Sequence, residues 1–286
     1  MLRTISKYLS LIKFSHTVFA MPFAAIGFVA GLRNVDFHVA PTKALWVICC
    51  MVFARSSAMA FNRWSDRKID AKNARTAGRE IPSGAIKANS ALWFTIITAL
   101  AFMVCAYQIN ELCFYLSPIA LLVILGYSLT KRFTALSHIV LGVGLSLAPV
   151  GAYLAVTGHF DWLPVMIGLA VITWVGGFDI IYALQDAEFD RQNHLHSIPA
   201  ALGIKGALTV SRMLHVGTSL LLIIPFMLHD FGWIYLVGWS VFSLLLIMQH
   251  RIAGSGDMSR INLAFFTANG IASMVFMAFA VGDMLI

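Results

Sequence analysis

The chain has 286 residues, of which 59% are apolar and 12% are charged. Soluble domains average about 45–50% apolar and about 25% charged residues, and the mean hydropathy here is +0.83. This composition excludes a disordered chain, a disulfide scaffold and almost any water-soluble enzyme. A membrane-spanning helix needs roughly 20 apolar residues. The sequence therefore predicts an all-α, polytopic membrane protein within a lipid bilayer, with no separate soluble domain.

Nine apolar segments follow one another along the chain, joined mostly by short loops. They cover residues 14–32, 44–61, 90–108, 112–130, 135–156, 163–184, 207–228, 232–250 and 261–282. Two connections, 62–89 and 185–205, are longer and more polar. The pattern favours nine transmembrane helices, and eight spans with one interfacial segment is the alternative that hydropathy alone leaves open.

The basic residues indicate the orientation of these spans. Of the 20 Lys and Arg residues, 16 fall in the N-terminal segment or in connections on its side of the membrane, and Arg212 lies near the same end of the span at 207–228, which makes 17. Cytoplasmic loops carry such an excess, so we expect the N-terminus and both long connections in the cytoplasm and the C-terminus outside. We attribute the net charge of +7 to these basic residues on the cytoplasmic side. We expect no nucleic-acid partner and infer no obligate protein partner.

Two clusters of acidic residues follow directly from apolar segments. The first contains Asn62, Asp66 and Asp70, and the second contains Asp179, Asp186 and Asp190. If the helices continue through the clusters, the four-residue spacing aligns each set on one helix face, with Asp179 two turns deeper in the membrane.

Aligned carboxylates repel one another, and the repulsion grows near a low-dielectric boundary. Mg²⁺ would compensate for this charge, because it binds one or two carboxylates together with waters and phosphate oxygens. Two such motifs facing each other would hold Mg²⁺ ions around a diphosphate. The alternative is that Asp66 and Asp70 are solvated charges at a helix end, paired with nearby Arg and Lys residues.

Basic residues near both clusters could complete an anion site. Arg75 and Arg79 follow the first cluster in a segment whose Gly and Pro residues predict a structured turn, and guanidinium groups bind phosphate oxygens in bidentate fashion. Lys131 and Arg132 follow the fourth apolar segment, where they could equally be ordinary topology markers. Arg55 lies inside the second apolar segment, and an intramembrane Arg is a functional candidate.

At these residues the chain resembles the UbiA superfamily of intramembrane prenyltransferases, over most of its length. The matching segments are Asn62–Asp70, Arg75–Gly84, Tyr127–Arg132 and Asp179–Asp190. Ser128 replaces a usual Pro, and Glu80 stands where Pro is common. The segments 59–63 and 196–200 are most similar to the 4-hydroxybenzoate polyprenyltransferase-like branch.

The resemblance implies one domain over residues 1–286, with nine helices around a central cavity. It implies an enzyme, a polyprenyltransferase that binds a polyprenyl diphosphate through two Mg²⁺ ions and transfers the prenyl group to an aromatic acceptor. The metal ligands would be Asp66, Asp70, Asp186 and Asp190 with Asn62, and Asp66 and Asp186 also count as catalytic.

The remaining roles concern the substrates. Arg75, Arg79, Lys131 and Arg132 would bind the diphosphate, Arg55 and Tyr182 would bind substrate, and Asp179 would orient or deprotonate the acceptor. Arg55 could bind an acceptor carboxylate or merely pair with Asp179. Phe53, Trp174, Phe178 and Tyr182 could shield an allylic cation, although plain helix packing is the better explanation for any one of them.

The acceptor we expect is 4-hydroxybenzoate, in ubiquinone biosynthesis at the inner membrane, with the active site facing the cytoplasm. A dihydroxynaphthoate in menaquinone biosynthesis is the alternative acceptor. An ion-coupled transporter is the alternative of a different class, but transporters usually place their carboxylates near the membrane midplane on broken helices. The prenyl chain length and the oligomeric state stay open.

Overall fold

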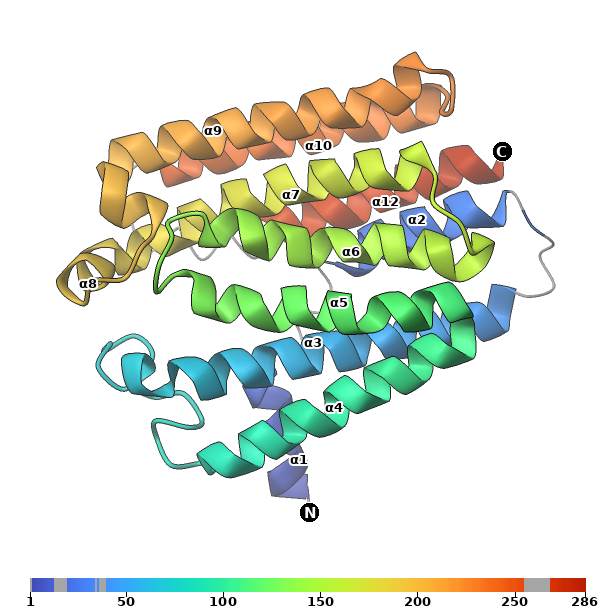
Figure 1. Ribbon diagram of the computed structural model, residues 1–286. Helices are drawn as coiled ribbons and strands as arrows, with labels where there is room; N and C mark the ends of the chain where they lie inside the picture. The colour runs from blue at the N-terminus through green and yellow to red at the C-terminus, as the bar shows by residue number, and fades with distance from the viewer. Residues whose placement is uncertain (1, 13–19, 34, 36–39, 255–267) are drawn as a thin grey trace. The chain divides into compact units, whose positions relative to one another are not determined.

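The computed structural model describes residues 2–12, 20–33, 35, 40–254 and 268–286. Every regular element in these ranges is helical, which confirms the all-α prediction. The chain divides into two compact units, which are taken separately below. Unit 1 comprises residues 1–17 and 41–129, and unit 2 comprises residues 18–40 and 130–286. Figure 1 shows the helices of both units with their labels.

Unit 1 consists of one short helix and three long ones. They are α1 (Leu2–Leu11), α3 (Ala40–Asp70), α4 (Ala88–Ile109) and α5 (Glu111–Thr130). Helix α3 continues for 31 residues because no Gly or Pro follows Pro41, near its start. Only Asn110 separates α4 from α5, and its Oδ1 accepts a hydrogen bond from the Cys113 amide at 2.8 Å, in the manner of an N-cap.

Helix α1 is fastened to the segment that follows α3. Leu11 packs in a buried apolar cluster with Ala60 of α3. Lys7 Nζ donates a hydrogen bond to the Ala85 carbonyl at 3.2 Å, and Ser10 Oγ donates to Glu80 Oε1 at 2.5 Å. The start of the chain is therefore linked to a turn that carries several of the predicted site residues.

Unit 2 contains six apolar helices of 12 to 30 residues and, between two of them, two short helices. In chain order they are α2 (Met21–Leu32), α6 (Ser137–Thr157), α7 (Trp162–Ala183), the 3₁₀ helix η3 (Leu184–Asp186), α8 (Ala187–Gln192), α9 (Ile198–Met227), α10 (Trp233–Ala253) and α12 (Asn269–Leu285). Helix α7 packs against both α6 and α9, and α2 packs against α6.

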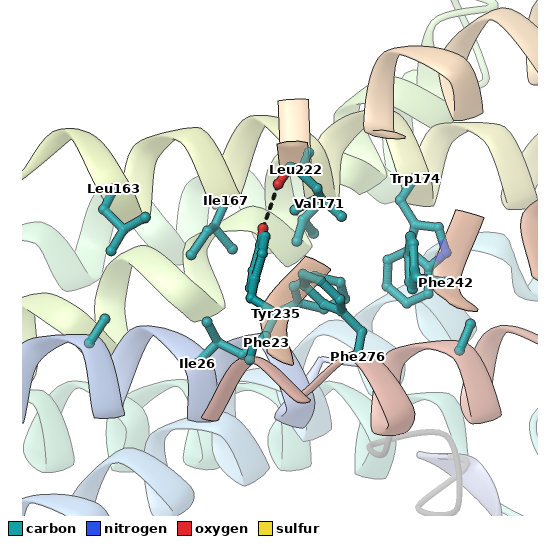
Figure 2. Close-up of a cluster of buried hydrophobic side chains, with 14 of the residues drawn as sticks. Phe23, Ile26, Leu163, Ile167, Val171, Trp174, Leu222, Tyr235, Phe242 and Phe276 are labelled. Carbon is teal, nitrogen blue, oxygen red and sulfur yellow. Dashed lines mark hydrogen bonds between the residues drawn. The ribbon is translucent and has the colours of Figure 1, made fainter. Parts of the chain in front are cut away.

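Aromatic side chains fill the core of unit 2, as Figure 2 shows. The ring of Phe23 on α2 lies 5.0 Å from that of Trp174 on α7 and 6.0 Å from that of Phe276 on α12. Such pairs each add about 0.5–1.5 kcal/mol beyond their buried area. The hydroxyl of the buried Tyr235 donates to the Leu222 carbonyl at 2.5 Å, so this core tyrosine is satisfied.

Two glycines permit the close approach of helices in this unit. A Cβ on Gly27 of α2 would collide with the backbone of Pro149 on α6, and one on Gly142 of α6 would collide with the backbone of Ile172 on α7. Small residues at helix interfaces allow backbones to approach in this way in membrane proteins. Helix α6 is thus in direct backbone contact with a helix on either side.

The lengths of the helices agree with a multi-pass membrane protein. Within the described residues, seven helices are long and apolar enough to cross a membrane. The first and ninth expected spans correspond to the shorter apolar helices α2, with 12 residues, and α12, with 17 residues. The rest of those two expected spans lies outside the described residues, so the number of nine crossings stays a prediction.

Helices extend into both polar connections, and the second one is corrected. The first is helical up to Asp70, as expected for a helix that continues through the acidic cluster. The second was expected to reach residue 205, but α9 already begins at Ile198. Ser197 caps this helix by accepting a hydrogen bond from the Ala200 amide at 3.3 Å, and Gly203, with φ of 67°, interrupts it shortly afterwards.

Candidate functional site

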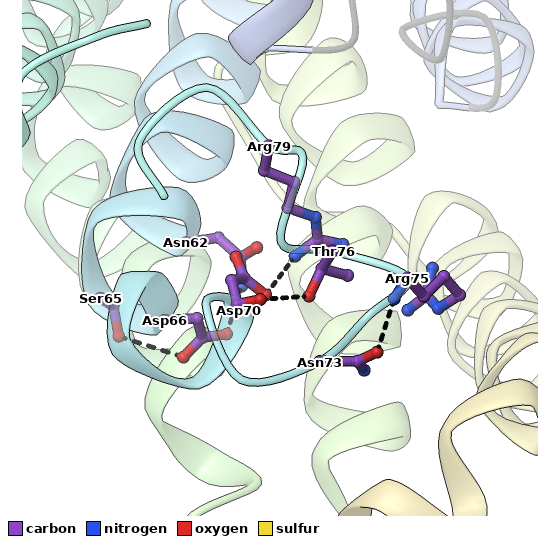
Figure 3. Close-up of polar contacts among 8 residues, drawn as sticks. All are labelled: Asn62, Ser65, Asp66, Asp70, Asn73, Arg75, Thr76 and Arg79. Carbon is purple, nitrogen blue, oxygen red and sulfur yellow. Dashed lines mark hydrogen bonds and ion pairs between the residues drawn. The ribbon is translucent and has the colours of Figure 1, made fainter. Parts of the chain in front are cut away.

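The first acidic motif lies on the last turns of α3, as Figure 3 shows. Asn62, Asp66 and Asp70 follow one another at four-residue spacing on this uninterrupted helix, which confirms the expected alignment. Asn62 Nδ2 donates a hydrogen bond to Asp66 Oδ2 at 3.3 Å. Asp66 and Asp70 are only 2% and 4% exposed, so the alternative of two solvated charges is wrong.

The turn after α3 folds back onto Asp70. Arg79 Nη1 lies 2.6 Å from Asp70 Oδ1, and Thr76 Oγ1 donates to the Asp70 carbonyl at 3.0 Å. The Asn73 side chain accepts from the amide of the exposed Arg75 at 2.9 Å. The prediction of a structured turn is confirmed, and Arg79 is the cation that this turn holds against Asp70 (Figure 3).

The first motif nevertheless retains a deficit of hydrogen-bond donors. Asp70 Oδ2 is buried and has no hydrogen-bond partner among the described residues. Asp66 and Asp70 also lie at the C-terminal end of α3, where the helix dipole is unfavourable for anions. A further cation at this oxygen would compensate for both effects.

Arg63, the residue after Asn62, was not selected as a site residue from the sequence. Its side chain is 5% exposed, and its Nε finds no hydrogen-bond acceptor in the described part of the chain. Asp70 and Arg79 are both within electrostatic range of it. The signal that could have revealed it is its position directly after Asn62, on a helix that continues through the motif.

Arg55 lies on the same helix, seven residues before Asn62. Its Nε is buried without a hydrogen-bond acceptor in the described ranges, and Tyr127 of α5 lies within electrostatic range of its guanidinium group. A guanidinium with an unused donor inside a membrane span is a suitable partner for an anionic group.

The fourth expected segment ends as α5 at Thr130, directly before Lys131 and Arg132. Lys131 is half-buried and Arg132 is exposed. The Lys131 carbonyl accepts a hydrogen bond from the His196 amide at 2.7 Å. This contact joins the basic pair to the loop that precedes α9.

The second acidic motif is not a continuous helical stripe, contrary to expectation. Asp179 and Tyr182 lie on α7, but this helix ends at Ala183. Asp186 closes the 3₁₀ helix η3, and Asp190 lies on the separate helix α8. The tighter 3₁₀ turn rotates the residues after it away from the face that a 3.6-residue period predicts.

Asp190 is the most buried carboxylate of the second motif, at 7% exposure. It forms a side-chain hydrogen bond with Ser197, the N-cap of α9, and Lys131 lies within electrostatic range. Asp186 and Tyr182 are half-buried, and Gln185 Nε2 donates to the Tyr182 carbonyl at 3.2 Å. Asp190 is therefore held by the start of α9 as well as by its own helix.

Asp179 contacts a histidine that the sequence interpretation did not select. Nδ1 of His138, the second residue of α6, lies 2.7 Å from Asp179 Oδ2. His138 Nε2 accepts the amide hydrogen of Ile198 at 3.5 Å. The side chain of His138 is 5% exposed and that of Asp179 is 23% exposed.

The donors of each motif suit Mg²⁺. This ion prefers oxygen ligands, and it commonly binds one or two carboxylates together with water and substrate phosphate oxygens. Asp66 and Asp70 offer such a pair, with one buried oxygen to spare, and Asp186 and Asp190 offer another. The described residues contain no group of three or more His, Cys, Asp or Glu placed to hold a metal ion. Water and substrate would therefore have to complete the coordination.

Comparisons with known proteins agree with this architecture. The UbiA prenyltransferase family model matches residues 20–271. A 4-hydroxybenzoate octaprenyltransferase of Tolumonas auensis is 32% identical over 228 residues, which cover 78% of this chain and 77% of that protein. The apo structure of a UbiA homolog from Aeropyrum pernix K1 superposes with a TM-score of 0.85 at 30% identity, covering 94% of this chain and 98% of that one.

A third relative, a UbiA homolog from Archaeoglobus fulgidus, was solved bound to DMAPP and Mg²⁺. It is similar in fold, with a TM-score of 0.74 at 22% identity over 98% of this chain and 99% of that one. The family match covers most of the sequence, and it includes both acidic motifs and the basic segments near them. The chain belongs to the UbiA prenyltransferase family and is a multi-pass membrane prenyltransferase similar to the 4-hydroxybenzoate octaprenyltransferases.

Proposed function

We propose that this protein transfers a polyprenyl group from a polyprenyl diphosphate to 4-hydroxybenzoate, with Mg²⁺, in quinone biosynthesis. The relative from Tolumonas auensis supports this acceptor by its name, and the homolog bound to DMAPP and Mg²⁺ supports the donor and the metal. The single observation that carries the proposal is Asp70. It is a buried carboxylate with one oxygen paired to Arg79 and the other without a hydrogen-bond partner among the described residues.

We assign the diphosphate head of the donor to the two acidic motifs. Mg²⁺ would be held by Asn62, Asp66 and Asp70 from the first motif and by Asp186 and Asp190 from the second. When bound, Mg²⁺ supplies positive charge that stabilises the diphosphate as a leaving group. Burial of Asp66, Asp70 and Asp190 supports this assignment, because buried carboxylates need a cation nearby.

The basic residues would bind the remaining diphosphate oxygens. Arg79 is held by Asp70 at 2.6 Å, so its other guanidinium nitrogens remain for phosphate oxygens. Arg75 and Arg132 are exposed and could reach a diphosphate from the aqueous side, and Lys131 is half-buried near Asp190. These donors would lower the cost of breaking the C–O bond of the donor, because negative charge develops on the diphosphate.

The acceptor would bind deeper in the membrane. The unused donor of Arg55 is suited to the carboxylate of 4-hydroxybenzoate. Once the C–O bond has ionised, the carbon ortho to the acceptor hydroxyl attacks the allylic cation, and the ring then loses a proton. We assign that proton to Asp179, which is partly exposed, and a substrate contact to Tyr182 one turn further along α7.

We further propose that residues 1–286 act as one domain in the inner membrane, with both acidic motifs facing the cytoplasm. The excess of Lys and Arg on the side of the two polar connections supports this orientation. Asn62, Asp66 and Asp70 lie in the first of those connections, and Asp186 and Asp190 lie in the second. The diphosphate would then reach the enzyme from the cytoplasmic side.

The proposal is tested with purified protein, Mg²⁺, a radiolabelled polyprenyl diphosphate and either 4-hydroxybenzoate or a dihydroxynaphthoate. We expect prenylated 4-hydroxybenzoate, and no product with EDTA, with Asp70→Asn or with Asp186→Asn. Glu188→Gln is the matched control, because Glu188 is an exposed carboxylate between the two aspartates of the second motif. Product only from the dihydroxynaphthoate would overturn the acceptor assignment, and full activity of Asp70→Asn would overturn the role of that carboxylate.

A further inference from the structure

His138 links the starts of two helices to the carboxylate of Asp179, to which we assign the proton from the acceptor ring. It is the second residue of α6, Asp179 lies on α7, and Ile198 is the first residue of α9. Both ring nitrogens of His138 are in contact with a polar group, one with Asp179 Oδ2 at 2.7 Å and one with the Ile198 amide at 3.5 Å. The imidazole is therefore a bridge and not a packing residue.

The contacts of the ring assign its tautomer. A backbone N–H can only donate, so Nε2 must accept the hydrogen of the Ile198 amide with its lone pair. The first amides of an α-helix lack partners within the helix, and Nε2 satisfies one of them. In the neutral ring the proton then resides on Nδ1, and it is donated to Asp179.

We propose that His138 is a positioning residue for the transfer reaction, which holds the carboxylate of Asp179 in the orientation that accepts the proton of the acceptor ring. This inference rests on the function proposed above. A carboxylate within a membrane span is costly unless a donor compensates for it. The Nδ1–H group supplies that donor and fixes Oδ2, so that Oδ1 is the oxygen left for the substrate.

The exposures of the two side chains support this division of roles. His138 is 5% exposed, so substrate has little access to it, whereas Asp179 is 23% exposed and can be reached. In the step itself, a new C–C bond forms between ring and prenyl carbons and the C–O bond to diphosphate breaks. The ring proton passes to Asp179 Oδ1, and the electron pair of that C–H bond restores the aromatic ring. His138 keeps its own proton throughout.

Two substitutions separate the two contacts of the ring. In His138→Asn the side-chain amide nitrogen takes the place of Nδ1, so the donor to Asp179 is kept and the acceptor for Ile198 is lost. In His138→Gln the amide reaches the place of Nε2, so the acceptor for Ile198 is kept and the donor to Asp179 is lost. His194→Asn is the matched control, because His194 is exposed and has a φ of 54°, which Asn tolerates well.

The test measures single-turnover rates with the acceptor that is active in the assay above, either unlabelled or deuterated at the reacting ring carbon. We expect His138→Gln to slow product formation by about 10- to 100-fold, the range for a lost hydrogen bond to a charged group. The deuterium isotope effect should rise in His138→Gln, because proton removal becomes rate-limiting. The KM for the polyprenyl diphosphate should not change, and His138→Asn and His194→Asn should stay close to wild type.

Three results would overturn the inference while leaving the proposed function intact. They are a larger loss in His138→Asn than in His138→Gln, equal losses in both variants, and an unchanged isotope effect in His138→Gln. The first two would indicate that His138 only stabilises the start of α9 or the fold. Inactive wild-type protein would instead refute the proposed function itself, and the inference would fall with it.

Discussion

Replacing Arg79 by Ala should make the stability of the protein depend on Mg²⁺. Arg79 and Asp70 lie 2.6 Å apart, and their side chains are 24% and 5% exposed. Removing one partner of a buried ion pair costs about 3–5 kcal/mol, whereas exposed pairs contribute about 0–1 kcal/mol. Because only Asp70 is fully buried, we expect Arg79→Ala to lower the free energy of unfolding by about 2 kcal/mol in EDTA.

Mg²⁺ should recover most of this loss if Asp70 is a metal ligand. A ligand at 100 times its Kd stabilises the folded state by about 2.7 kcal/mol, and this applies to wild type as well. The variant should gain more than wild type, because it leaves both oxygens of Asp70 for the metal and binds Mg²⁺ more tightly. The assay is thermal unfolding in detergent micelles, where about 2 kcal/mol corresponds to a shift in Tm of about 4–8 °C for a chain of 150–250 residues. The difference in Tm between wild type and variant should be large in EDTA and small in saturating Mg²⁺.

A second substitution and an exposed pair serve as controls for this prediction. Asp70→Asn removes the buried charge, so Arg79→Ala should cost little in that background. Arg191→Ala should give no shift in Tm, because it breaks an exposed pair. Arg191 and Glu188 lie 3.4 Å apart, and their side chains are 58% and 70% exposed. The reasoning is refuted if Arg79→Ala costs the same with and without the carboxylate, or if Mg²⁺ restores none of the loss.

Three further predictions address the acceptor, the packing and the topology. Arg55→Ala should raise the KM for the acceptor by about 10- to 100-fold without affecting the KM for the diphosphate, and an unchanged acceptor KM in steady-state assays would exclude the carboxylate role. Gly142→Val should lower the Tm measurably, because its side chain would meet the backbone of Ile172 and overpacking costs about 1–3 kcal/mol; a wild-type Tm would contradict that close approach. In a cysteine-free background, an impermeant thiol reagent applied to intact cells should label His159→Cys but not Lys72→Cys, and the reverse pattern would invert the proposed orientation.

The long helices could be predicted because each depends on local composition. Apolar runs located α4, α5, α6, α7 and α10 to within a few residues. The start of α9 was missed because hydropathy does not register Ser197, whose capping hydrogen bond begins the helix ahead of its apolar part. The end of α7 at Ala183 was missed because no Gly or Pro there signals the change to a 3₁₀ turn.

The candidate site was predictable only where its residues are neighbours on one helix. Asn62, Asp66 and Asp70 could be aligned by counting, because α3 runs through them without interruption. His138 could not be found in this way, since its partner Asp179 is 41 residues away and His138 itself stands inside an apolar segment. Contacts between helices depend on packing, which a single sequence read segment by segment does not contain.

The hydrogen bonds of α1 affect how mutations near the start of the chain should be interpreted. Lys7 and Ser10 bind the backbone and side chain of the turn that brings Arg79 to Asp70. A substitution at either position would loosen that turn without touching any substrate. In a mutational scan such variants would be classed with active-site mutants, although their defect is the loss of a hydrogen bond between α1 and this turn. Purification tags are for the same reason better placed at the other terminus.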